Sequence, residues 1–473
     1  MSVAKPVIVD LDGTLTHSDT LLENVLLLLK GNPLMILLLP FWLLKGKAVL
    51  KNRIAERVAL DVSLLPYNGD VLAYLRQARN EGHACYLATG APAKTANAVS
   101  DYLQLFDGIF STTDSTNLTG SRKAQLLNER FGEGNYIYLG NHAVDLKIWH
   151  HAGEAVVVSN SHLLLQQAQR LCGNARQLAP PKATLKTWLK AIRVHQWVKN
   201  ALLLVPLLTS HQWQDPQLLL LAVIGFFCFS LAASSVYVLN DLLDLAADRQ
   251  HPSKRKRPFA SGVISLHAGV ALLPLLLLLV GLLALLLPAG FVWALALYYL
   301  LTLLYSFKLK RIVMLDTIVL AGLYTMRIVA GTLLLGVDFS FWLLAFSMFI
   351  FLSLALVKRY TELLLLKDSE RMKTAGRGYH AEDAGMLSGL GAASGYIAVL
   401  VFALYVNSPD VLELYARPQV LWLACPVLLY WISRVWLVAH RGQMDDDPIV
   451  FAVKDLQSLF TGLCVLAIFG AAL

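Results

Sequence analysis

The acidic residues between positions 240 and 248 have a spacing that could hold a metal ion. Asn240, Asp241, Asp244 and Asp248 directly follow the apolar run FFCFSLAASSVYVL. Residues three, four and seven apart share one face of a helix, so these carboxylates would repel each other unless a divalent cation lay between them. Magnesium prefers oxygen ligands and bridges carboxylates to phosphates. The spacing therefore predicts a magnesium site, with a solvated helix end as the alternative.

A second acidic pair lies near the start of the chain. The stretch VIVDLDGTLT (7–16) indicates a buried strand followed by Asp10 and Asp12. Side chains two residues apart at a strand end point the same way, so both carboxylates can face one phosphate. A carboxylate that attacks a phosphate needs a metal to reduce their mutual repulsion. The pattern thus predicts a metal-assisted phosphate site.

The composition indicates a membrane protein joined to a soluble part. Of the 473 residues, 56% are hydrophobic and only 15% are charged, which is too apolar for an ordinary soluble protein. The five cysteines are scattered, a pattern typical of neither a disulfide framework nor a zinc site. Apolar blocks long enough to cross a bilayer as helices predict nine spans. They lie near 197–212, 216–239, 266–287, 289–305, 313–335, 339–357, 385–406, 418–438 and 455–473.

Residues 1–175 have the pattern of a soluble α/β domain. Short apolar runs such as KPVIVD, ACYLAT and EAVVVS alternate with helix-like segments, which favours a parallel sheet covered on both faces. We predict a linker at 176–190 and a transmembrane domain at 191–473. The first residues lack the charged-then-apolar order of a cleavable signal, so we expect this domain to stay in the cytoplasm.

Basic residues of the membrane part concentrate in alternate loops. The loops after the second, fourth, sixth and eighth spans are basic, whereas the intervening loops hold only Arg417. By the positive-inside rule the basic loops are cytoplasmic. Because this distribution explains most of the net charge of +8, nucleic-acid binding is not indicated. The residues are Arg249, Lys254, Arg255, Lys256, Arg257, Lys308, Lys310, Arg311, Lys358, Arg359, Lys367, Arg371, Lys373, Arg377, Arg441 and Lys454.

Two further segments are predicted to lie at the membrane surface. KTWLKAIRVHQWVKN (186–200) combines two tryptophans with basic residues, as in a helix in the headgroup region. A helical cap is expected at 20–65, and its stretch ENVLLLLKGNPLMILLLPFWLLKGK is interrupted by Pro33 and Pro40, which argues against a span. An interfacial hairpin is our prediction, and a cap helix packed on the membrane domain is the alternative.

The segment 240–262 resembles the first aspartate-rich motif of the UbiA-type membrane prenyltransferase superfamily. The likeness rests on N-D-x-x-D-x-x-x-D followed by HPxKxxRPxASG. Members are polytopic enzymes, so the resemblance implies an all-α membrane domain of about nine transmembrane helices. The superfamily usually carries a second motif, DxxxD. Here Asp316 is followed by Leu320 where the second acid would stand, which argues against the ionisation of a prenyl diphosphate.

Within this superfamily the chain resembles the polyprenyl-phosphate phosphoribosyltransferases, the branch of the decaprenyl-phosphate enzymes. These enzymes move a 5-phosphoribosyl group from phosphoribosyl pyrophosphate to a polyprenyl phosphate and release pyrophosphate. The stretches that carry the likeness, besides 240–262, are RVHQWVKN (193–200), YSFKLK (305–310), KRYTEL (358–363) and GQMDDDPIVFAVKD (442–455).

This resemblance implies a set of site residues in the membrane domain. Asp241, Asp244 and Asp248 would hold Mg²⁺, with Asp241 and Asp244 catalytic. Candidate phosphate or substrate partners are Lys199, Asn240, Lys254, Arg257, Tyr305, Lys308, Lys310, Asp316, Arg327, Lys358 and Arg359, and His251 is a further candidate donor. Asp316 and Arg327 fall within an apolar block, where an unpaired charge costs about 2.5 to 3.5 kcal/mol. A structural ion pair between these two residues is the alternative.

The stretch VIVDLDGTLT resembles the first motif of the haloacid dehalogenase (HAD) phosphohydrolases, and the later motifs follow in order. The resemblance implies a Rossmann-like domain in which Asp10 is the nucleophile and Asp12 the general acid and base. Thr89 and Lys123 would bind phosphate, and Asp145 would join Asp10 and Asp12 as a magnesium ligand. Asn141 stands where the fourth motif usually begins with an acid, which leaves Asp145 to complete the metal site.

Together the resemblances predict two reactions on one chain of a bacterial inner membrane. Transfer of phosphoribose to polyprenyl phosphate would be followed by removal of the 5-phosphate, giving polyprenyl-phospho-ribose for cell-envelope glycans. One alternative is a prenyltransferase for an aromatic or lipid acceptor with an independent phosphatase. Another is a receptor-like or scaffold protein with a degenerate HAD module. The oligomeric state stays open, with a homo-oligomer as one possibility.

Overall fold

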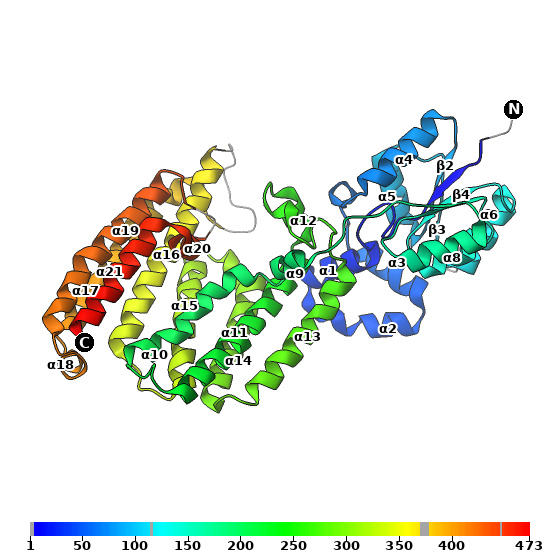
Figure 1. Cartoon of the computed structure of the whole chain (residues 1–473). Helices are drawn as coiled ribbons and strands as arrows, with labels where there is room; N and C mark the ends of the chain where they lie inside the picture. Colours follow the sequence, from blue (N-terminus) through cyan, green and yellow to red (C-terminus); the bar gives the residue numbers. More distant parts are fainter. Residues whose placement is uncertain (1–3, 114–116, 369–377, 445–446) are drawn as a thin grey trace. The chain divides into compact units, whose positions relative to one another are not determined.

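The computed structural model describes residues 4–113, 117–368, 378–444 and 447–473 (Figure 1). Its packing divides the chain into two compact units, which are described separately. The first consists of Met1–Ile192 with Tyr237–Pro274, and the second of Arg193–Val236 with Leu275–Leu473. Arg371, Lys373 and Arg377 of a predicted cytoplasmic loop lie outside the described residues.

The first unit contains a parallel sheet of six strands in the order β3-β2-β1-β4-β5-β6. These strands are β1 (Val7–Val9), β2 (Cys85–Pro92), β3 (Gly108–Thr112), β4 (Ile137–Gly140), β5 (Glu154–Val157) and β6 (Ala175–Gln177). The central strand β1 pairs in parallel with β2 and with β4, so the segments that follow these three strands meet at one edge. The sheet confirms the predicted Rossmann-like α/β fold.

Helices cover both faces of this sheet (Figure 1). On one face Val7 and Val9 pack with residues of α4 (Gly69–Asn80) and α5 (Ala93–Leu103). On the other face Ile8 packs with residues of three helices. They are α6 (Ser121–Phe131), α7 (Leu146–Trp149) and α8 (His162–Cys172). Successive residues of β1 point to opposite faces of the sheet, and both faces are covered by helices. All three residues of β1 are therefore apolar.

The segment between β1 and α4 is helical, as predicted for a cap. Helix α1 begins where the Asp19 side chain accepts a hydrogen bond from the backbone N–H of Leu22. The elements are α1 (Thr20–Gly31), η1 (Pro33–Leu37), α2 (Leu39–Leu44), α3 (Lys47–Arg57) and η2 (Val62–Leu64).

The acidic segment of the first unit differs from the single helix that the spacing predicted. Helix α11 (Pro216–Leu243) ends just before Asp244, whose backbone angles are φ −101° and ψ 17°. A separate helix, α12 (Leu245–Gln250), carries Asp248. The 3₁₀ turn η5 (Lys254–Lys256) and the start of α13 (Leu266–Ala284) follow. Because of this break, Asp244 is no longer in the same helical register as Asp241.

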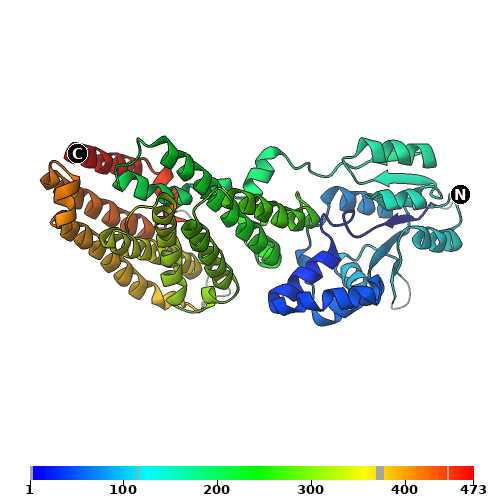
Figure 2. The same cartoon turned by 90° about the horizontal axis from the view of Figure 1, so that it is seen from below.

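The second unit is helical throughout its regular elements, and its long helices are shown from below in Figure 2. Helix α16 packs between α15 and α17. Gly391 on α17 permits a close approach, because an added Cβ would lie 2.0 Å from the Trp436 ring. The elements are η4 (Val194–Leu204), α10 (Val205–Thr209), α14 (Ala289–Phe307), η6 (Leu309–Arg311), α15 (Leu315–Leu335), α16 (Phe341–Asp368), η7 (Ala381–Asp383), α17 (Ala384–Val406), α18 (Pro409–Leu414), η8 (Pro418–Leu423), α19 (Ala424–His440), α20 (Pro448–Lys454) and α21 (Leu456–Ala472).

The described part of the chain has seven helices long and apolar enough to cross a membrane, or eight if the bent pair α20–α21 counts as one span. The expected number of nine is therefore approximate. Residues 197–212 form the 3₁₀ helix η4 and the short helix α10 instead of a span. The last predicted span is preceded by an 80° bend between α20 and α21, where the Asp455 side chain caps α21 by accepting from Ser458. The protein is a multi-pass membrane protein.

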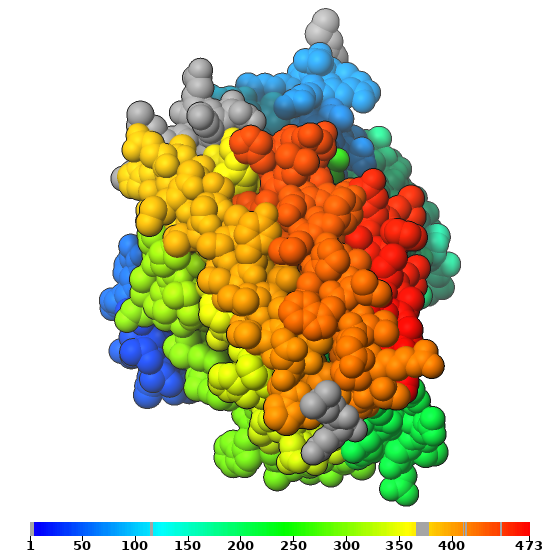
Figure 3. Space-filling model, turned by 90° about the vertical axis from the view of Figure 1, so that its left-hand side faces the viewer, coloured from blue at the N-terminus to red at the C-terminus, as the bar shows by residue number. Residues whose placement is uncertain are grey.

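The surface of the second unit fits a lipid environment. Figure 3 shows the face formed by α17, α19 and α21, in orange and red. Exposed apolar side chains on these helices include Leu400, Leu429 and Leu463. The predicted surface helix at 186–200 is not continuous, because α9 (Leu185–Ala191) ends before Arg193, which has a left-handed φ of 53°.

Candidate functional site

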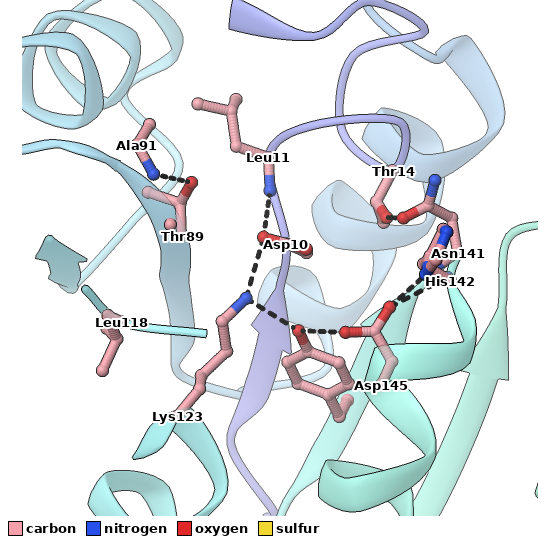
Figure 4. Close-up of polar contacts among 12 residues, drawn as sticks. Asp10, Leu11, Thr14, Thr89, Ala91, Leu118, Lys123, Asn141, His142 and Asp145 are labelled. Carbon is pink, nitrogen blue, oxygen red and sulfur yellow. Dashed lines mark hydrogen bonds and ion pairs between the residues drawn. The ribbon is translucent and has the colours of Figure 1, made fainter. Parts of the chain in front are cut away.

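Side chains of the first unit converge where β1, β2 and β4 end (Figure 4). Asp10 follows β1, and its Oδ1 accepts hydrogen bonds of 2.9 Å from Lys123 Nζ and from the backbone N–H of Leu11. Lys123 lies on α6 and is almost fully buried. The predicted nucleophile and the predicted phosphate-binding lysine are thus in direct contact.

Asp145 is joined to the same group through Tyr138. The Tyr138 hydroxyl donates to Asp145 Oδ1 at 3.2 Å, while Lys123 Nζ donates to that hydroxyl at 3.1 Å. The backbone N–H groups of Asn141 and His142 each donate to Asp145 Oδ2 at 3.0 Å. A continuous polar chain therefore connects Asp10 to Asp145.

Asn141 packs against the turn that carries the first motif. Its Oδ1 accepts a hydrogen bond of 3.2 Å from the Thr14 hydroxyl. Gly13 has a φ of +72°, and an added Cβ there would lie 2.1 Å from Asn141 Nδ2. Glycine is required at this position because both the backbone angle and the close approach disfavour any side chain.

Two acids of this region, Asp12 and Asp145, have raised pKa values. Burial, together with Asp19 and Asp10, raises the pKa of Asp12 to about 7, although Asp12 Oδ1 accepts a hydrogen bond of 2.8 Å from the Thr20 N–H. Burial and Asp10 likewise raise the pKa of Asp145 to about 6, against the opposing effect of Lys123. The carboxylates outweigh the cations that face them, an arrangement suited to a bound cation.

Thr89 and Lys51 lie at the end of β2. The buried Thr89 hydroxyl accepts a hydrogen bond of 3.0 Å from the Ala91 N–H. Lys51 reaches in from α3 and donates to the Gly90 carbonyl at 2.6 Å and to Asn117 Oδ1 at 3.1 Å. Burial lowers the pKa of Lys51, and the negative charges of Asp12 and Asp19 partly offset this decrease. Lys51 is a candidate phosphate-binding residue that the sequence did not indicate.

In the acidic segment, Arg257 draws two of the predicted metal ligands together. Its Nη1 lies 3.0 Å from Asp241 Oδ1 and 2.7 Å from Asp248 Oδ2, and both acids are buried. Burial raises the pKa of Asp248 although Arg257 opposes this. Two carboxylate oxygens within reach of one atom form a donor pair that suits an oxygen-preferring cation.

Asp244 lies apart from this pair. Its Oδ1 is 2.7 Å from Nζ of Lys30, which lies in the last turn of α1. The carbonyl of Asn240 accepts a hydrogen bond from the Asp244 N–H at 2.9 Å, and the ring of His251 contacts the Ser253 hydroxyl. Lys254 begins η5 and is partly buried.

Neither acidic group forms a closed metal site by itself. Among the described residues, no three His, Cys, Asp or Glu side chains are arranged to hold a metal ion. The donor chemistry nevertheless fits magnesium, because the first group carries excess buried carboxylate and the second presents a carboxylate pair.

In the second unit the buried Asp316 pairs with Arg359. Arg359 donates from Nε to Asp316 Oδ2 at 2.5 Å and from Nη2 to the Tyr305 hydroxyl at 2.9 Å. Glu362 accepts from Nη1 of Arg359 at 2.7 Å, and the Tyr379 hydroxyl donates to Asp316 Oδ1 at 2.6 Å. The structure thus joins three predicted residues, and the ion pair considered between Asp316 and Arg327 is replaced by Asp316–Arg359.

Arg327 occupies a separate polar position within the helices. Its guanidinium donates to Asn200 Oδ1 at 2.9 Å, to the Leu323 carbonyl at 2.6 Å and to the Tyr298 hydroxyl at 2.9 Å. The charge also lies 5.4 Å from the Phe229 ring centroid. These contacts stabilise a cation that would be costly in an apolar environment.

Lys199 and Lys358 meet at Asp447. Lys199 donates to Asp447 Oδ2, and Lys358 Nζ lies 3.6 Å from the same oxygen. Burial alone would raise the pKa of Asp447, but Lys358 and Lys199 outweigh it and lower the pKa to about 2. Asp447 also caps α20 by accepting from the Ile449 N–H at 3.1 Å. Two cations thus share one carboxylate.

The remaining predicted phosphate partners lie at the end of α14. Lys308 is exposed at the C-terminus of this helix, and Lys310 lies in the following turn η6. Asn240, Asp241, Asp244, Asp248, Lys254 and Arg257 belong to the first unit, whereas the other predicted residues of the membrane domain belong to the second.

Sequence reasoning missed Lys51, Tyr138, Tyr379 and Asp447. Tyr138 is an alternating residue of β4, and Lys51 has no motif, so neither carried a signal. Asp447 could have been found, because an Asp–Pro step before an apolar run is typical of a helix start.

Comparison with known proteins identifies the family of the membrane part. Residues 201–460, more than half of the chain, match the UbiA prenyltransferase family. The protein y4nM of Sinorhizobium fredii is 39% identical to this chain, and the alignment spans 99% of this chain and 91% of y4nM. The decaprenyl-phosphate phosphoribosyltransferase of Mycobacterium tuberculosis is 31% identical and covers 62% of this chain and 96% of its own.

Solved structures similar to part of the chain include a phosphatase. A substrate-bound phosphoserine phosphatase, 15% identical, covers 40% of this chain and 99% of its own, with a TM-score of 0.28. On the match to residues 201–460, the chain belongs to the UbiA prenyltransferase family.

Proposed function

We propose that this protein transfers a 5-phosphoribosyl group from phosphoribosyl pyrophosphate to a polyprenyl phosphate and then removes the 5-phosphate. The product would be a polyprenyl-phospho-ribose, a lipid-linked sugar donor for cell-envelope glycans. The observation that carries the proposal is the 31% identity to a decaprenyl-phosphate phosphoribosyltransferase, which is covered over 96% of its length.

In the first step, a phosphate oxygen of the lipid attacks C1 of the ribose. The C1–oxygen bond to pyrophosphate breaks, and pyrophosphate leaves with the bonding electron pair. Magnesium held by Asp241 and Asp248, with Asp244 as a third proposed ligand that pairs with Lys30 in this structure, would neutralise charge on the leaving diphosphate. Fixed cations would bind the other phosphates. The candidates are Lys199, Lys254, Arg257, Lys308, Lys310, Arg327, Lys358 and Arg359.

In the second step, a carboxylate oxygen of Asp10 attacks the 5-phosphate. The bond between O5 and phosphorus breaks as Asp12 gives its proton to O5, which leaves an aspartyl-phosphate. Asp12 then takes a proton from the water that hydrolyses this intermediate. Before a cation binds, burial and the nearby Asp19 and Asp10 raise the pKa of Asp12, which favours the protonated form that gives its proton to O5. Lys123 and Lys51 would stabilise the phosphate charge, and magnesium on Asp10, Asp12 and Asp145 would reduce its repulsion by the carboxylates.

The proposed location is a bacterial plasma membrane with both sites on the cytoplasmic side. The alternating basic loops support this orientation. We further propose domain limits of 1–175 and 191–473 with a linker at 176–190. Covalent attachment of the phosphatase would raise its effective concentration for the transferase product.

A prenyltransferase reaction is the second candidate, since the family takes its name from that activity. The position of the missing second acid argues against it. Leu320 packs against an apolar cluster that includes Ala321 and Tyr324. A carboxylate in that cluster would be costly to bury.

The test uses the full chain in liposomes with ribose-labelled phosphoribosyl pyrophosphate, polyprenyl phosphate and Mg²⁺. We expect the wild type to form a labelled lipid without the 5-phosphate. Asp10→Asn is expected to accumulate the phosphorylated lipid, and Asp244→Asn to form neither lipid. Lys30→Gln, which breaks the Lys30–Asp244 pair but keeps the carboxylate, separates the loss of the pair from the loss of a metal ligand. Asp101→Asn, at an exposed acid of α5, is the control.

Two results would contradict the proposal. Formation of no labelled lipid by folded wild type, together with consumption of a prenyl diphosphate, would favour the prenyltransferase. Formation of a phosphorylated lipid that the wild type never dephosphorylates would remove the second step and leave the first intact.

A further inference from the structure

The cap of the first unit exposes a continuous apolar segment. We call residues 33–44, formed by η1 and α2, the apolar hairpin. None of its side chains is buried. Leu44 is 85% exposed and Leu34 is 71% exposed. The other large apolar side chains that are at least 40% exposed are Ile36, Leu37, Leu38, Phe41 and Leu43.

This concentration differs from the rest of the unit. Other exposed apolar side chains, such as Tyr102, Val144 and Leu163, lie on separate elements. Single exposed apolar residues are normal on a soluble surface, whereas a contiguous patch marks a binding surface. We therefore expect the exposed apolar surface of the hairpin to contact a partner.

The charges beside the hairpin select an anionic partner. Lys45 and Lys47 follow it directly and are exposed. Arg57, from the end of α3, lies over the Trp42 ring at 4.8 Å. Apolar side chains bordered by lysine and arginine are typical of segments that lie in an anionic lipid surface.

Two ion pairs hold the start of the hairpin near the end of a membrane-crossing helix. Glu23 on α1 accepts from Arg249 at 2.9 and 2.7 Å, and both side chains are buried. Lys30 pairs with Asp244, the residue directly after α11. Because Lys30 is only three residues before Pro33, the hairpin begins within about 11 Å of that attachment. A bilayer crossed by α11 is therefore within its reach.

From this geometry we infer that the apolar hairpin inserts into the headgroup region of the membrane, where Lys45 and Lys47 contact anionic lipid phosphates. Twelve residues interrupted by prolines are too few for a span, so the hairpin lies in one leaflet. This inference needs only the bilayer and holds whatever the transferase substrate is.

The hairpin connects two helices that reach the phosphate site of the first unit. The Thr20 N–H of α1 donates to Asp12, and Lys51 of α3 donates to the Gly90 carbonyl. Insertion would hold this site at the lipid surface. Under the proposed function, on which this step rests, its substrate class is a phosphate monoester carried by a lipid.

The experiment replaces Phe41 by the photocrosslinker p-benzoylphenylalanine in the full chain. The protein is reconstituted in nanodiscs of phosphatidylcholine with or without phosphatidylglycerol and irradiated. Its peptides are then analysed by mass spectrometry for lipid adducts. Leu163, which is 66% exposed on α8 compared with 63% for Phe41, receives the same substitution as the matched control. We expect lipid adducts at position 41 and none at position 163.

A lipid adduct at both positions, or at neither, would overturn the inference. An adduct between position 41 and protein would also overturn it, because the hairpin would then cover another segment or a second copy. In the Lys45→Gln, Lys47→Gln variant, we expect the gain in adduct yield given by phosphatidylglycerol to fall about fivefold or more. An unchanged gain would remove the anionic lipid from the inference. Adduct formation does not depend on catalysis, so failure here is distinct from failure of the proposed function.

Discussion

The acidic group of the first unit and the charged clusters of the second treat buried charge in opposite ways. Around Asp12, burial and neighbouring carboxylates raise the pKa to about 7. Around Asp447, two lysines lower the pKa to about 2. The first arrangement leaves negative charge for a mobile cation to neutralise. In the second arrangement, Lys199 and Lys358 neutralise Asp447 and are positioned to bind an anion.

Breaking a fixed pair in the second unit should have the largest effect. Arg359→Met leaves Asp316 buried and fully enclosed without its cation. We expect a loss of about 3 to 5 kcal/mol in stability, measured by thermal unfolding in detergent. Adding Asp316→Asn should restore most of the loss, because the buried charge is then removed. A double variant as unstable as the single one would mean that shape, and not charge, sets the effect.

Removing a carboxylate from the first unit should have the opposite sign. The raised pKa of Asp12 means that its contribution to stability is present below pH about 4 and is lost as the pH rises through about 7. In EDTA at pH 8, Asp12→Asn should therefore stabilise the fold by about 2 kcal/mol, a value reduced by partial solvent exposure. At pH 4 the variant and the wild type should unfold at the same temperature. A destabilised variant at pH 8 would contradict the excess of negative charge.

Lys51 sharpens the comparison, because it is a cation within the acid-rich group. Lys51→Gln removes the charge but can keep a hydrogen bond to the Gly90 carbonyl. We expect the rate of phosphate release to fall roughly tenfold, or about 1.4 kcal/mol. Lys147→Gln on α7 is a control with the same change of charge. Equal rates in the two variants would exclude Lys51 from the phosphate site.

A neutral contact of the second unit should matter least. Trp197→Phe removes the hydrogen bond of 2.9 Å from the indole N–H to the Ser234 hydroxyl. The expected loss is about 1 kcal/mol, measured by the same thermal unfolding. A loss as large as that of Arg359→Met would show that hydrogen bonding, rather than compensation of charge, stabilises this unit.

The sequence predicted the features that depend on local spacing. The buried run 7–9 and the acids after it followed from strand periodicity, and the apolar blocks predicted most of the membrane helices. Asp10, Lys123 and Asp145 could be related to one another only through the resemblance, because they lie on different elements. The partners of Asp316 and Asp447 come from distant helices, and no local pattern encodes them. The break at Asp244 was missed because helical spacing continues across it.

Helix α1 links the N-terminal part of the chain to residues 244–249, which lie within the family match at 201–460. The helix touches Asp12 at its first residue and Asp244 at its last turn, and its Glu23 forms a buried pair with Arg249. A chain that kept residues 201–460 but lacked α1 would leave Arg249 without its Glu23 partner. We expect substitution of one residue alone to destabilise this pair, because the other charge would stay buried without a partner. Among relatives that keep both halves, positions 23 and 249 should therefore change together, whereas relatives without the first half should vary freely at the position equivalent to 249.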